Sequence, residues 1–125
     1  MSDQIPPDVE AFISEWIGSI VELELLLLLA EAPEKSWEAE SVARQLYVTP
    51  KSVEAILERM TARGLLARAT EGCRFAPVRS ELIGTVKSLR EEYSRRRLRV
   101  MEWIYAGPTE KYQSFADAFR LRKHP

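Results

Sequence analysis

The sequence predicts one mainly helical domain with a small β-hairpin, spanning residues 8–106 of the 125-residue chain. Three observations lead to this fold class. Apolar residues recur at steps of three and four near both ends of the chain. Two short helical patterns in the middle meet at a Thr-Pro turn, and the segment LLARATEGCRFAPV (65–78) is typical of a strand, a turn and a returning strand. The length suffices for one hydrophobic core.

Residues 8–32 are expected to form one or two helices, because Gly18-Ser19 can interrupt the helical pattern. The stretch VELELLLLLA (21–30) consists mostly of strong helix formers, and Pro33 ends it. A membrane span needs about 20 apolar residues, so this run is too short for one. Because its apolar residues cover nearly the whole circumference, we expect burial on more than one side.

Residues 36–78 contain two short helical patterns followed by the hairpin. Thr49 is a good N-cap for the second helix, and Pro50 suits the first helical position. Arg63-Gly64 is typical of a helix C-terminus. The order is therefore helix, helix, tight turn, helix and hairpin, with the hairpin at residues 66–75.

The segment ESVARQLYVTPKSVEAILERMTARGLLA (40–67) resembles MarR-like and related bacterial winged-helix regulators. The resemblance covers roughly residues 20–78. It implies a winged helix-turn-helix flanked by N- and C-terminal dimerisation helices, a role in transcription regulation, and a bacterial origin. The N-terminus lacks a secretory pattern, and a single cysteine fits a reducing compartment, so we expect a cytoplasmic protein.

The resemblance implies that the helix beginning at Thr49 enters the major groove of double-stranded DNA while the hairpin touches the backbone or minor groove. Arg68 and Arg74, on opposite strands, could bracket a phosphate or enter a minor groove. The predicted DNA-binding residues are Thr49, Lys51, Ser52, Arg59, Arg63, Arg68 and Arg74. Surface arginines are also often merely solvated. Glu54 and Glu58 would repel phosphates, so the alternative is a winged-helix protein-interaction module that does not bind DNA.

Residues 79–106 are expected to form one long helix with a heptad-like apolar seam interrupted by Arg96. We expect this helix and the first one to make a homodimer, which would match a two-fold DNA site. The predicted interface residues are Phe12, Trp16, Ile20, Leu89, Tyr93, Val100 and Trp103. The alternative is that both helices fold back on their own chain. Residues 1–35 carry eight acids and one lysine, and residues 79–125 carry eleven basic residues and six acids, so the two ends can attract each other.

Residues 107–125 are expected to form a short amphipathic basic tail, in which Phe115 and Phe119 could dock on the dimer or on another protein. One histidine, His124, and one cysteine, Cys73, provide no acid–base pair and no metal cluster. We therefore expect neither an enzyme nor a metal or cofactor. Cys73 could sense oxidants beside Arg68 and Arg74, or could be an inert small hydrophobic residue.

Overall fold

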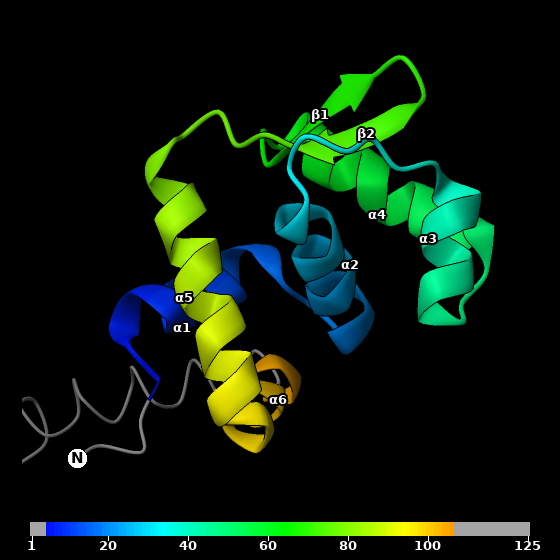
Figure 1. Ribbon diagram of the computed structural model, residues 1–125. Coiled ribbons are helices and arrows are strands. Elements are labelled where there is room, and N and C mark those ends of the chain that lie inside the picture. The colour runs from blue at the N-terminus through cyan, green and yellow to red at the C-terminus, as the bar shows by residue number, and fades with distance from the viewer. Residues whose placement is uncertain (1–4, 107–125) are drawn as a thin grey trace, which may run out of the picture.

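The computed structural model describes residues 5–106, which form six helices and a two-stranded antiparallel hairpin (Figure 1). The elements are α1 (Pro7–Trp16), α2 (Ile20–Glu31), α3 (Ala39–Leu46), α4 (Pro50–Ala62), β1 (Leu66–Ala69), β2 (Gly72–Phe75), α5 (Glu81–Arg95) and α6 (Arg97–Tyr105). The predicted fold class is confirmed. The tail with Phe115, Phe119 and His124 lies outside the described residues. Within residues 5–106, none of the helices has the length and apolarity that crossing a membrane requires.

The N-terminal region forms two helices rather than one. Residues 17–19 interrupt it, and Ser19 caps α2 by accepting a hydrogen bond from the backbone N–H of Glu22 at 3.2 Å. A serine in extended conformation at this position satisfies one of the free N–H groups of the first turn. The cap therefore starts a new helix in a new direction, which allows α2 to enter the centre of the molecule.

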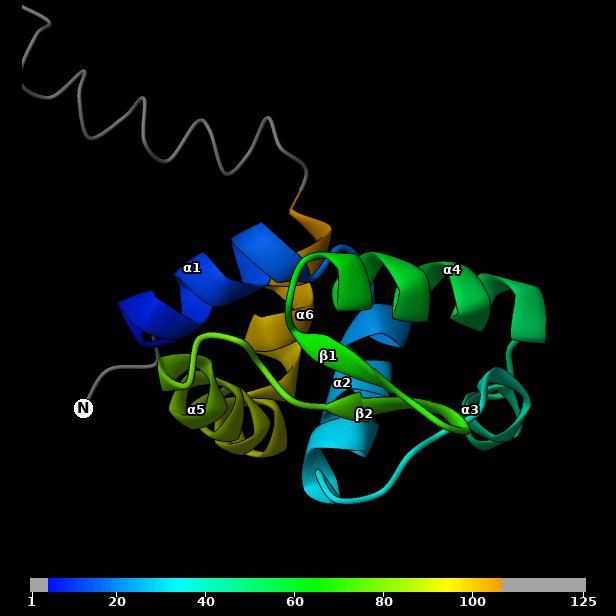
Figure 2. The same ribbon diagram turned by 90° about the horizontal axis from the view of Figure 1, so that it is seen from above.

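Helix α2 lies at the centre and packs against α3, β2 and α5 (Figure 2). Leu23, Leu25, Leu26 and Leu29 are completely buried. These four side chains point in several directions around the helix, so α2 needs apolar residues on more than one side. The expected two-sided burial of the leucine run is confirmed.

Helices α3 and α4 form the helix-turn-helix. Tyr47 ends α3 in the left-handed conformation, with φ 59° and ψ 44°, and its N–H donates to the carbonyl of Ala43. Thr49 caps α4 by accepting a hydrogen bond from the N–H of Ser52 at 3.3 Å, and Pro50 occupies the first turn. The predicted start of the second motif helix is therefore correct.

The hairpin is extended by a residue that the sequence pattern did not reveal. The N–H of Trp37 donates to the carbonyl of Cys73 at 2.8 Å, and the N–H of Cys73 donates to the carbonyl of Trp37 at 2.9 Å. This close approach requires Gly72, which has a φ of +102°, because a side chain there would overlap the Trp37 carbonyl. The hairpin thereby fixes the point at which α3 begins.

The expected single helix over residues 79–106 is two helices, α5 and α6, separated at Arg96 (φ −128°, ψ 53°). The guanidinium of Arg96 binds the carboxylate of the buried Glu92 at 2.8 Å, one turn earlier. This residue is the charged interruption in the seam, and the break redirects α6 so that both α5 and α6 contact α1. The apolar seam is therefore covered within its own chain.

Candidate nucleic-acid interface

The exposed face of α4 is set by its buried face. Val53, Ile56, Leu57 and Met60 pack into the core. The opposite side is exposed, and at its N-terminal end the Ser52 hydroxyl donates to the Thr49 carbonyl at 2.8 Å. Thr49, Pro50, Lys51 and Ser52 are all exposed. A capped, solvent-facing helix N-terminus with a lysine favours contact with an anion.

A hollow of about 520 Å³ separates the outer face of α4 from the hairpin. Two cations, Lys51 and Arg68, line it together with two carboxylates, Glu54 and Glu58. The charges of this hollow therefore balance. The middle of α4 therefore carries no excess positive charge beside the hairpin.

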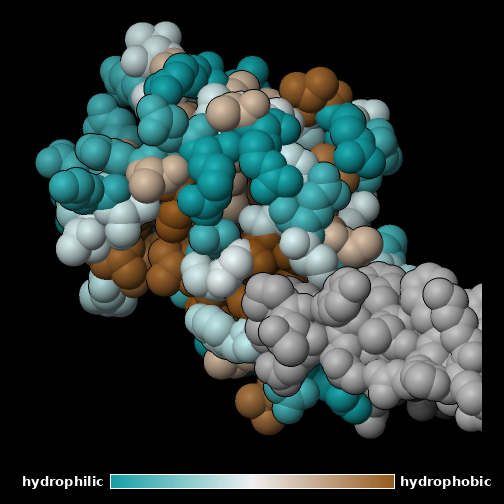
Figure 3. Space-filling model, turned by 180° about the vertical axis from the view of Figure 1, so that it is seen from behind, coloured by the Kyte–Doolittle hydropathy of each residue, from teal (hydrophilic) through white to brown (hydrophobic). Residues whose placement is uncertain are grey.

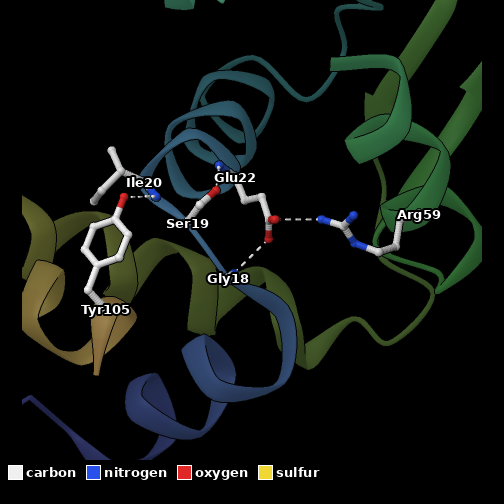
Figure 4. A network of polar contacts seen from close by, with 6 residues as sticks. All are labelled: Gly18, Ser19, Ile20, Glu22, Arg59 and Tyr105. Carbon is white, nitrogen blue, oxygen red and sulfur yellow. Dashed lines mark hydrogen bonds and ion pairs between the residues drawn. The ribbon is translucent and has the colours of Figure 1, made fainter. Parts of the chain in front are cut away.

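Arg59 forms an ion pair with Glu22 of α2 (Figure 4). Its Nη2 lies 2.8 Å from Oε2 of Glu22, and Oε1 of Glu22 accepts the N–H of Gly18 at 2.8 Å. At the same junction the Tyr105 hydroxyl accepts the N–H of Ile20 at 3.1 Å. The structure thus directs Arg59 at the connection between α1 and α2, although it was predicted to contact DNA.

Arg63 is also directed at the N-terminal helices. Its guanidinium carbon lies 4.2 Å from the centroid of the Trp16 ring, which itself stacks on Phe12 with centroids 6.0 Å apart. A cation over an indole face is stabilised by the ring quadrupole. Arg63 therefore links the end of α4 to α1, and a contact with DNA would have to displace it.

The two wing arginines lie on opposite faces of the hairpin. In the strand register Arg68 pairs with Cys73 and Arg74 pairs with Ala67, and side chains of successive residues alternate between faces. Arg68 lines the hollow beside α4, whereas Arg74 lines a different hollow of about 570 Å³ with Lys87 and Arg90. This placement on opposite faces does not favour the two arginines bracketing one phosphate.

Two residues of the turn region, Arg44 and Tyr47, were not predicted as site residues. Both are exposed, and Tyr47 is the most exposed of the large hydrophobic residues described, at 94%. Both residues line each of two hollows, of about 420 and 520 Å³. A left-handed conformation costs a residue with a side chain about 1–2 kcal/mol. Nothing in the spacing of apolar residues indicates that an aromatic residue would occupy this position.

The predicted dimer residues lie mainly inside their own chain. Phe12, Trp16, Leu89 and Val100 are buried, and Ile20, Tyr93 and Trp103 are partly buried against the same core. The Trp103 indole donates to the Glu10 carbonyl at 3.1 Å, and the Tyr93 hydroxyl donates to Glu24 at 3.1 Å. In this arrangement the helices fold back on their own chain, which was the alternative reading of the seam.

Other apolar side chains do reach the surface. Leu98 and Tyr105 are 73% and 58% exposed, and their separation of seven residues places them on one side of α6. Seen from behind, the molecule shows a hydrophilic surface with hydrophobic side chains gathered in a band across its middle (Figure 3). The described part of the chain therefore offers apolar surface beyond its own core.

Cys73 is buried, and its sulfur lies 3.6 Å from the Thr61 hydroxyl. Oxidation favours exposed thiols, so burial favours the role of a small core residue for Cys73. Across residues 5–106, no three His, Cys, Asp or Glu side chains come together as a metal site would require.

Together, a tight turn, a capped second helix and a hairpin wing define a winged helix-turn-helix protein. No protein-family model matches this chain, and no curated protein sequence matches it. The structure is similar to the crystal structure of the Mycobacterium tuberculosis MarR family protein Rv2887, with a TM-score of 0.51, 19% identity, and coverage of 92% of this chain and 84% of that chain. A crystal structure of Rv2887 in complex with salicylic acid matches with a TM-score of 0.48, 19% identity, and coverage of 92% and 88%. The likeness to the first structure confirms a MarR-like winged-helix fold.

Proposed function

We propose that this chain is a DNA-binding transcriptional regulator that acts as a dimer. The observation that carries the proposal is the exposed, Thr49-capped N-terminus of α4, flanked by Lys51 and Arg44, within a winged helix-turn-helix. Helices of this motif present their N-terminal residues to base edges and phosphates in the major groove. The likeness in fold to a MarR family protein supports the same role.

The charge distribution restricts which part of the surface meets DNA. Glu54 and Glu58 offset Lys51 and Arg68 beside the middle of α4, while Arg59 is paired with Glu22. We therefore place the contact at the N-terminal end of α4 and the adjacent turn. Arg68 and Arg74 stay candidates for separate backbone contacts on the two faces of the wing.

Fluorescence anisotropy with a random-sequence duplex at low salt tests the proposal. The affinity should fall as salt is added, because binding releases counterions from the phosphates. Lys51→Glu should weaken binding about tenfold and lower the salt slope by roughly one. Arg95→Glu makes the same charge change at an exposed position on α5 and serves as the matched control. An absence of salt-sensitive binding at micromolar protein would exclude the regulator role.

The second candidate is a protein-interaction module, which the exposed Glu54 and Glu58 on α4 favour. The two functions predict different effects of removing these charges. If α4 meets DNA, Glu58→Gln should tighten binding several-fold by removing repulsion from the phosphates. If the chain is instead an interaction module that does not bind DNA, Glu58→Gln produces no salt-sensitive duplex binding.

We propose that the dimer forms through surface residues rather than through the seam predicted from the sequence. Leu98 and Tyr105 on α6 provide exposed apolar surface for such a contact. Sedimentation equilibrium should show a dimer for the unsubstituted chain and a weaker association for Leu98→Glu. A monomer at all concentrations would contradict dimerisation, whereas an unchanged dimer with Leu98→Glu would place the interface elsewhere.

A further inference from the structure

The turn between α3 and α4 holds an almost fully exposed aromatic side chain in an unfavourable backbone conformation. Tyr47 has φ 59° and ψ 44°, a region that glycine or asparagine occupies more easily than tyrosine. Its side chain is 94% exposed, so almost none of its surface is buried in compensation. Within the described chain, neither the backbone position nor packing explains a tyrosine here.

The surroundings of Tyr47 are suited to a polyanion. The hollow of about 420 Å³ on one side is lined by Lys35, Ser41, Arg44 and Gln45 as well as Trp37 and Tyr47, with no carboxylate among them. The second hollow, of about 520 Å³, is distinct from the one between α4 and the hairpin. It is lined by Arg44 of α3, by Pro50 at the start of α4, and by one carboxylate, Glu40. Tyr47 thus lies close to two cations, Lys35 and Arg44, and beside the exposed N-terminus of α4.

We propose that Tyr47 is a contact residue for the sugar–phosphate backbone of duplex DNA at the edge of the groove that α4 enters. The phenol hydroxyl donates to a phosphate oxygen while the ring packs on the adjoining sugar, and Arg44 supplies the neighbouring positive charge. The inference rests on the proposed DNA-binding function and names a residue that positions α4 on the duplex. Because the contact is with the backbone, its loss affects different sequences to the same extent.

Two measurements on variants test the assignment. Tyr47→Asn should weaken duplex binding about tenfold with little change in salt slope, because no charge is lost. The same variant should raise the melting temperature by roughly 4 °C, since asparagine tolerates the left-handed conformation better. Tyr47→Phe keeps the ring and should lose less affinity, whereas Arg44→Gln should lower the salt slope by about one.

Nitration of the unsubstituted protein provides a test that does not depend on variant folding. Free protein should react at Tyr47, which is 94% exposed, and saturating duplex should protect Tyr47 from reaction. Equal nitration of Tyr47 with and without bound DNA, or wild-type affinity of Tyr47→Asn, would overturn the assignment and leave the proposed function intact. Failure of the unsubstituted protein to bind duplex would instead overturn both, and protection of Tyr47 by a protein partner would then indicate the interaction-module role.

Discussion

Replacing Gly72 with alanine should disrupt the junction between the hairpin and the start of α3. The added Cβ would overlap the Trp37 carbonyl and lie 2.9 Å from the Glu38 nitrogen, in a backbone conformation with φ +102°. The conformation alone costs a residue with a side chain about 1–2 kcal/mol. If Trp37 moves away from β2 to make room for the Cβ, the two Trp37–Cys73 hydrogen bonds also break, at about 1 kcal/mol each. We therefore expect the free energy of unfolding to fall by about 3–4 kcal/mol.

Urea unfolding followed by circular dichroism measures this loss as a lower midpoint at a similar slope. Gly84→Ala is the matched control, because a Cβ at this position on α5 meets nothing within 4 Å. Alanine in an exposed helix interior should raise stability by roughly 0.5–1 kcal/mol. The reasoning would be refuted if Gly72→Ala unfolded at the wild-type midpoint, or if the two substitutions shifted the midpoint equally.

Three further predictions concern contacts within the described chain. A double-mutant cycle of Arg59→Gln and Glu22→Gln should give a coupling of about 0.2–1 kcal/mol, because Arg59 is 46% exposed and solvent screens the pair; zero coupling would show that the pair does not stabilise the fold. Burial, followed by the nearby Glu24 carboxylate, raises the pKa of Tyr93, so folding favours its neutral phenol and stability should be lost as the pH rises above about 10. Unfolding at successive pH values should show less of this loss in Tyr93→Phe, and identical profiles would refute the cause. Leu29→Ala should cost about 2–5 kcal/mol and the exposed Val78→Ala under about 0.5 kcal/mol, with equal losses in thermal unfolding arguing against the central position of α2.

The sequence patterns correctly predicted those helix boundaries and turns that depend on interactions between neighbouring residues. Thr49 and Pro50 mark the start of α4 because a hydroxyl cap and a fixed φ both act within one turn. The hairpin was likewise visible in its sequence, and Gly18-Ser19 marked the junction of α1 and α2. The break at Arg96 was visible only as a charged residue in an apolar seam, and the sequence did not show that the helix would stop there.

The candidate site was predictable only in part. Lys51 and Ser52 face solvent as expected, because the buried side of α4 follows directly from helical spacing. Arg59 and Arg63 lie on the same helix, but their partners, Glu22 and Trp16, come from segments more than 30 residues away in the sequence. Helical periodicity does not reveal partners so far away in the sequence. Arg59 and Arg63 were therefore predicted to contact DNA, whereas in the fold they contact Glu22 and Trp16.

The sequence by itself therefore determined a leucine-rich helix, a capped second motif helix and a hairpin, because propensity, periodicity and capping operate over a few residues. Only the tertiary structure decided that α5 and α6 cover α1 within one chain, that Arg68 and Arg74 lie on opposite faces, and that Tyr47 stands exposed beside α4. These features depend on the directions in which whole elements pack. That direction follows from burying α2 on several sides at once, which is a property of the assembled core rather than of any one segment.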